Sequence, residues 1–119
     1  MKDIAIYGAG GFGREIACVI NKINAKKKIW DLIGFFDDGI DKGRQVSHFG
    51  KVLGDIHDLN LWGKPLNVVF AIGEPEIIRH LVEKIDNPRV DFPNIIHPDA
   101  VVNDPITFRI GRGDRKSVV

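Results

Sequence analysis

The stretch IAIYGAGGFGREIACVI, residues 4–20, decides the fold. In it, the apolar run Ile4–Tyr7 enters a cluster of glycines, and an amphipathic segment leaves that cluster. Gly8, Gly10 and Gly13 have the spacing G-x-G-x-x-G, which is typical of a strand-to-helix turn that holds a phosphate. Glycine lets the backbone approach a phosphate closely, and the first N–H groups of a helix attract anions. The stretch therefore predicts a Rossmann-like phosphate site. Its ligand is a dinucleotide or another phosphate-bearing molecule, and a tight turn without a ligand is the third interpretation.

Beyond this stretch the pattern alternates between strands and helices. We expect helices at 12–23 and 76–85, a helix cap at Asp55, and strands at 4–7, 32–36, 51–53, 66–72 and 90–96. The first and fourth strands are almost wholly apolar, as strands buried on both faces should be. This order predicts an α/β fold, with a Rossmann-like parallel sheet flanked by helices.

The composition of the chain indicates its size class and the kinds of partner it is unsuited to bind. A chain of 119 residues predicts one domain, and 44% hydrophobic with 28% charged residues is typical of a soluble globular protein. The net charge of +1 argues against a nucleic-acid or membrane-surface partner. We find no secretory pattern and no apolar run of about 18 residues, so we expect a cytoplasmic protein. The single cysteine, Cys18, excludes a disulfide framework within the chain and is expected to be a buried core thiol.

Further site candidates follow the second and fourth strands. Asp37 and Asp38 lie at the position where an acid hydrogen-bonds a ribose in dinucleotide-binding folds. Aspartates before Gly39 also favour a turn, which is the alternative. Gly73 follows the fourth strand, at the edge where ligands bind in open α/β sheets. Only about five strands are expected, which is too few for two mononucleotide-binding halves, so a single nucleotide with a pendant group fits better. The histidines show no spacing for a metal site or a catalytic site, and we assign no catalytic or metal-binding residue.

The composition changes after His97, where the helical period ends. Ile110-Gly111 has the form that opens one rung of a left-handed β-helix. We therefore divide the chain into a nucleotide-binding domain (1–96), the start of a truncated left-handed β-helix (97–113) and a tail (114–119). The tail, DRKSVV, does not continue a rung, and it can be back-translated to match a common sequencing-adapter sequence. We interpret it as non-native, and a natural truncation or frameshift is the alternative.

Five segments of the chain occur in a characteristic order: IAIYGAGGFGREIACVI, LIGFFDD, VLGDIHDL, VVFAIGEP and FPNIIHPDAVV. Together they resemble the N-terminal domain of bacterial sugar O- and N-acetyltransferases of the NeuD/PglD type. The resemblance covers residues 1 to about 113. It implies that this domain binds a UDP- or CMP-linked sugar rather than a dinucleotide. It also implies a C-terminal left-handed β-helix that forms homotrimers, binds acetyl-CoA and carries the general-base histidine.

Carried onto this sequence, the resemblance places the nucleotide sugar on the glycine loop (Gly8, Gly10, Gly11, Phe12 and Gly13), with Asp37 and Asp38 near the uridine or ribose and Gly73 at the mouth. His97 does not match the family's general base. We therefore expect this chain alone to be a monomeric binding domain without acetyl-CoA or transferase activity. The alternative is an NAD(P)-binding fragment of an oxidoreductase.

Overall fold

The computed structural model describes residues 1–93 with their side chains and the backbone of residues 110–112 and 115–117. The described residues include the helices α1 (Gly11–Lys26), α2 (Ile56–Asn60) and α3 (Pro75–Lys84). Six strands form one sheet in the order β3-β4-β2-β1-β5-β6, and their bounds are β1 Lys2–Tyr7, β2 Trp30–Phe36, β3 Gln45–Val46, β4 Gly50–Gly54, β5 Leu66–Phe70 and β6 Val90–Asp91. All neighbouring strands pair in parallel except β3 and β4. The α/β fold with a sheet flanked by helices is thus confirmed.

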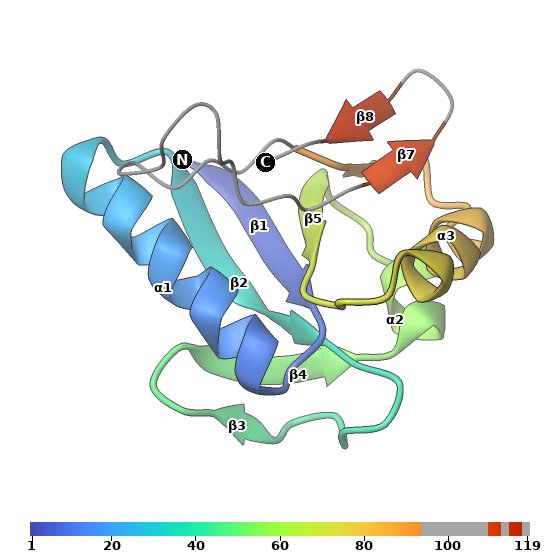
Figure 1. The fold of residues 1–119 in the computed structure, drawn as a ribbon, viewed down its shortest axis with the longest axis horizontal. Helices are drawn as coiled ribbons and strands as arrows, with labels where there is room; N and C mark the ends of the chain where they lie inside the picture. The colour runs from blue at the N-terminus through green and yellow to red at the C-terminus, as the bar shows by residue number, and fades with distance from the viewer. Residues whose placement is uncertain (94–109, 113–114, 118–119) are drawn as a thin grey trace.

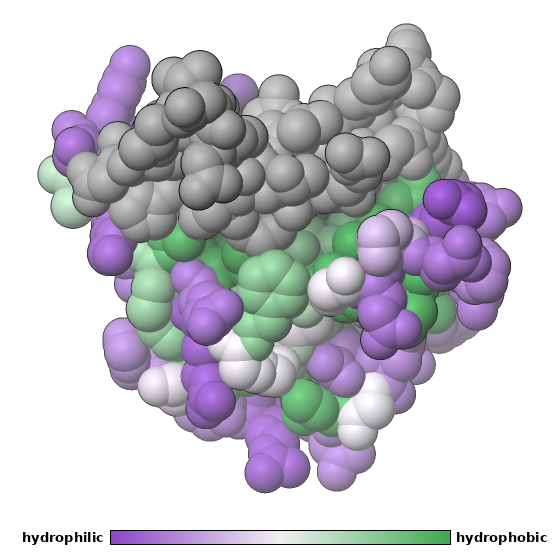
Figure 2. Space-filling view, in the orientation of Figure 1, coloured by the Kyte–Doolittle hydropathy of each residue, from purple (hydrophilic) through white to green (hydrophobic). Residues whose placement is uncertain are grey.

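A separate hydrophobic core lies on each face of the sheet. In Figure 1, α1 covers one face, and α2 and α3 cover the other. Ile16, Ala17 and Ile20 of α1 are almost completely buried in the first core, and Leu59 of α2 and Leu81 of α3 in the second. Hydrophilic side chains gather over the outer surface of α3 (Figure 2). The sheet is therefore fixed from both sides, which holds the ends of its strands in place.

The strand order reverses direction between β1 and β5. From β1 the chain moves outward to β2 and then to β4, and it returns to β5 on the other side of β1. Ligands in open α/β sheets bind at such a switch point, outside the carboxyl ends of the strands. Here that position lies between the loop after β1 and the loop after β5.

Most predicted elements agree with the structure to within a few residues at their ends. The predicted strand 66–72 ends earlier, at Phe70. Asp55 caps α2 as expected, in a reciprocal capping box with Asp58. The antiparallel strand β3 was not expected, because two residues are too short for a recognisable alternation. β6 has two residues, and the last three residues of the predicted strand 90–96 lie outside the described part of the chain.

The expectation that Cys18 is a core thiol was wrong. Cys18 is exposed on α1, although Ala17 and Val19 on either side of it are buried. The apolar run around it is longer than the stripe that a helix buries against a sheet. One residue in the run therefore faces solvent.

Part of the predicted organisation falls outside the described residues. The structure does not describe most of the expected β-helix start (97–113) or part of the tail (114–119). The described pieces there are two short strands, β7 (Ile110–Arg112) and β8 (Arg115–Ser117), which pair antiparallel. The three-part division of the chain stays a prediction.

Candidate functional site at the carboxyl edge

Backbone hydrogen bonds tie together the carboxyl ends of four adjacent strands. The Ala71 N–H after β5 donates to the Tyr7 carbonyl at 2.8 Å, and the Gly8 N–H donates to the Phe36 carbonyl at 2.7 Å. Farther along the edge, the Asp37 N–H donates to the Gly54 carbonyl of β4 at 3.0 Å. The loops that carry the predicted site residues therefore start from a common, rigid edge.

Gly8 and Gly13 are required by the packing of the turn. Gly8 has a φ of +118°, and a Cβ there would lie 2.7 Å from the Ala71 carbonyl oxygen. A Cβ on Gly13 would collide with the carbonyl oxygen of Gly8. These are the roles of the first and third glycines of a nucleotide-binding turn, namely the tight turn and the close approach of helix to strand.

Three other glycines of the candidate site are not required by packing, because a side chain in their place would face open space. They are Gly10, Gly11 and Gly73. A Cβ on Gly10 or Gly73 would meet nothing within 4 Å, and one on Gly11 would meet the end of the Arg14 side chain at 3.8 Å. These glycines leave the backbone bare at the switch point. Packing between described residues does not require glycine at these positions, and the open space is what close approach of a ligand would need.

The N-cap residue of α1 supplies no side-chain acceptor to the first turn of the helix. Gly10 is its N-cap residue and has no side chain to accept a bond, and the first turn contains no acid. Phe12 in that turn is half-buried and packs against the core beneath α1. The positive end of the helix dipole therefore faces the opening beside Gly10 and Gly11.

Asp37 holds the glycine loop in place. One of its oxygens accepts from the Ala9 N–H at 2.8 Å, and the other accepts from Gly39 N–H at 2.8 Å and Ile40 N–H at 3.1 Å. The turn interpretation of this acid is confirmed, and Asp37 also contacts the glycine loop. Its contact with a ribose stays a prediction. Both of its oxygens are occupied by the protein itself.

Asp38, the next residue, is exposed and has a different partner. Its Oδ1 accepts a hydrogen bond from the Tyr7 hydroxyl at 2.6 Å. Burial, together with this bond to the carboxylate, raises the pKa of the Tyr7 hydroxyl well above its ordinary value. The hydroxyl is thus protonated at neutral pH and donates to Asp38.

A cavity of about 270 Å³ adjoins the glycine loop. It is lined by Ala9, by Arg14 of α1 and by residues of the connection between β2 and β4, including Arg44. Arg14 and Arg44 make no ion pair with a described residue. Arg79, by contrast, lies 3.6 Å from Glu76 on the same helix. Two cations therefore border the side of the opening where α1 begins.

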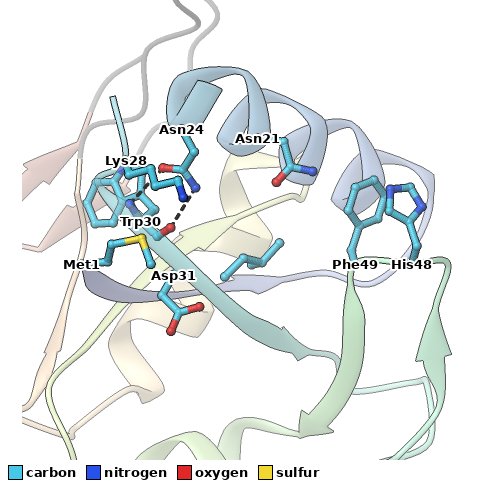
Figure 3. A pocket seen from close by; sticks show the side chains of 9 residues that line it. Met1, Asn21, Asn24, Lys28, Trp30, Asp31, His48 and Phe49 are labelled. Carbon is cyan, nitrogen blue, oxygen red and sulfur yellow. Dashed lines mark hydrogen bonds between the residues drawn. The ribbon is translucent and has the colours of Figure 1, made fainter. Parts of the chain in front are cut away.

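Other features of the described residues do not join this site. A second cavity, of about 290 Å³, lies beside α1. Figure 3 shows Asn24 and Trp30 in its lining, joined by hydrogen bonds, and the Asn24 side chain also accepts from the Ile29 N–H. None of the predicted site residues lines it. Within residues 1–93, no cluster of three metal-ligating side chains occurs, and no helix of the described chain is long and apolar enough to cross a membrane.

Comparison with known families decides the assignment. The family model for the PglD N-terminal domain matches residues 3–85, a span that includes every predicted site residue. The chain belongs to the PglD N-terminal domain family. The resemblance to the NeuD/PglD type is thereby confirmed.

Two solved structures of an acetyltransferase domain are similar to this chain. The acetyltransferase domain of PglB from Neisseria gonorrhoeae FA1090 in complex with acetyl coenzyme A is 29% identical, with a TM-score of 0.61, over 82% of this chain and 45% of that one. A second structure of the same domain is 27% identical, with a TM-score of 0.64, over 85% of this chain and 47% of that one. The chain thus spans less than half the length of either. A search of curated proteins finds no match.

Tyr7 is a residue of the candidate site that sequence reasoning missed. It was counted as part of an apolar strand, yet its hydroxyl reaches the exposed edge of the sheet. One signal was present in the sequence: a tyrosine at the end of a buried strand needs a partner for its hydroxyl. The identity of that partner required the tertiary structure, because Asp38 is 31 residues away.

Proposed function

We propose that this PglD-family chain is the nucleotide-sugar-binding domain of an acetyl-CoA-dependent sugar acetyltransferase. The observation that carries the proposal is the bare backbone at the switch point, where Gly10, Gly11 and Gly73 leave open space. The similarity to an acetyltransferase domain that binds acetyl coenzyme A supports the class of reaction.

The distribution of charge suggests how the ligand lies. The start of α1, where the N-cap Gly10 has no side chain, lies beside Arg14 and Arg44 and favours the diphosphate. The exposed carboxylate of Asp38 repels phosphate and favours a group that donates hydrogen bonds, such as a ribose hydroxyl. The sugar would then extend toward Gly73. This orientation uses Gly8 and Gly13 as the frame of the turn, and Phe12 as the residue that seats α1 on the sheet.

We assign no described residue to acetyl-CoA or to proton transfer. A general base must lie within hydrogen-bond reach of the attacking amine or hydroxyl. In the family that the sequence resembles, that base belongs to the β-helix. We therefore propose that the chain alone binds the UDP- or CMP-linked sugar as a monomer without transferring an acetyl group, and that the longer family protein acts as a cytoplasmic homotrimer.

Calorimetric titration of the 119-residue chain with UDP, CMP and NAD tests the proposal. We expect UDP or CMP to bind and NAD not to bind. Gly73→Ala should weaken that binding, because the new methyl group occupies the open space. Gly63→Ala is the matched control, since a Cβ there also meets nothing within 4 Å, in the loop before β5 and not at the switch point.

Binding of NAD alone would overturn the proposal and favour the oxidoreductase fragment, for which the comparisons give no support. Equal effects of Gly73→Ala and Gly63→Ala on nucleotide affinity would show that the opening at Gly73 is not part of the site.

A further inference from the structure

One pair of side chains connects the buried core to the exposed site. Tyr7, the last residue of β1, has only 2% of its surface exposed. Its ring lies between the rings of Phe36 and Phe70, with centroid distances of 6.3 and 5.6 Å. Because the flanking strands fix these rings, the position of the Tyr7 hydroxyl is set by the packing of the sheet.

Asp38 receives its orientation from this fixed hydroxyl. It lies beyond the end of β2, where an exposed aspartate would otherwise sample several rotamers. The bond of 2.6 Å between the hydroxyl and Oδ1 selects one of them. The second oxygen, Oδ2, accepts no hydrogen bond from any described residue.

The neighbouring acid, Asp37, has no free carboxylate oxygen to offer to a ligand. Asp37 accepts three backbone N–H groups with its two oxygens. Of the two adjacent carboxylates, Asp38 alone therefore offers an unoccupied and oriented oxygen at the edge of the sheet.

We propose that Tyr7 is a positioning residue that aims Asp38 Oδ2 at the ribose 2′-hydroxyl of the bound nucleotide. The inference rests on the proposed nucleotide-sugar site and adds to it the residue that orients Asp38. A carboxylate accepts a hydrogen bond from a hydroxyl and repels a phosphate, so the pair selects the ribose and distinguishes ribonucleotides from 2′-deoxyribonucleotides. The hydroxyl of Tyr7 does not touch the ligand and acts only through Asp38.

A double-mutant cycle in nucleotide affinity tests this role. Tyr7→Phe keeps the ring and removes the hydroxyl, and Asp38→Asn weakens the acceptor. The ligand is whichever of UDP and CMP binds the unaltered chain, together with its 2′-deoxy form. We expect Tyr7→Phe to raise the Kd of the ribonucleotide by about fivefold and that of the deoxy form much less. In the Asp38→Asn background, Tyr7→Phe should have little further effect.

Two more variants separate positioning from folding. Asp38→Glu keeps the charge but moves the carboxylate away from the Tyr7 hydroxyl, so it should also lose preference for the ribonucleotide. Asp41→Asn, an exposed acid in the same loop, is the control and should bind like the unaltered chain. If Tyr7→Phe does not fold, Asp38→Glu alone decides.

The failures are distinguishable. If the unaltered chain binds neither UDP nor CMP, the proposed function fails and this inference fails with it. If it binds one of them but Tyr7→Phe and Asp38→Glu retain full affinity and discrimination, the site stands and the positioning role is overturned. A purely structural tyrosine would lower the melting temperature and leave the ratio of ribo to deoxy affinity unchanged.

Discussion

Glycines and aspartates occur in both an inner and an outer region of the carboxyl edge of the sheet, and they have different roles in the two. In the inner region, Gly8 and Gly13 are pressed against backbone, and Asp37 is saturated by backbone N–H groups. In the outer region, Gly11 and Gly73 border open space. The outer region also contains Asp38, which has a free oxygen. The inner residues build the turn, and the outer ones are available to a ligand.

This difference separates stability from binding. A change in the inner region should alter the folded state whether or not a ligand is present. A change in the outer region should leave the free protein nearly unaffected and appear in ligand affinity. Three substitutions test that division.

Gly13→Ala should have the largest effect. Its Cβ would collide with the backbone carbonyl of Gly8, which cannot move without separating α1 from β1. We expect the free energy of unfolding to fall by about 3 kcal/mol or more. Urea denaturation measures this loss, and an unchanged midpoint would show that the turn has room that the structure does not contain.

Asp37→Asn should have an intermediate effect. One oxygen is replaced by an NH₂ group, so either the Ala9 N–H or the turn at Gly39 and Ile40 loses its acceptor. We expect a loss of about 2 kcal/mol, because an N–H group of the edge is left without a partner. Asp41→Asn serves as the control in the same denaturation experiment. Equal midpoints for the two variants would contradict the anchoring role of Asp37.

Gly11→Ala should have the smallest effect on stability. Its Cβ has space, and alanine is favoured over glycine within a helix, so the free energy of unfolding should stay constant or rise by about 0.5 kcal/mol. Affinity for the nucleotide should nevertheless fall by about tenfold, equivalent to about 1.4 kcal/mol. Denaturation and calorimetry on one sample compare the two quantities. A variant that is more stable and binds equally well would mean that the ligand does not approach Gly11.

Much of the fold was predictable from local patterns. The apolar run before Gly8 and the amphipathic run after it indicated a strand, a turn and a helix, and all three are present. The cap at Asp55 was also predictable, because capping depends on a few adjacent residues. β3 was not predictable, because its pairing with β4 depends on the neighbouring strand and not on its own two residues.

The sequence by itself determined the parallel α/β arrangement, the glycine turn and the placing of two acids at the end of β2. Only the tertiary structure decided which residues of the site are occupied by the protein and which are free. Gly11 and Gly13 look alike in the sequence, and so do Asp37 and Asp38. Gly13 meets the carbonyl of Gly8 in the same turn, whereas Gly11 faces open space. The two acids differ because Asp37 accepts from Ala9 and Asp38 from Tyr7, contacts that join the end of β2 to the end of β1, far apart along the chain.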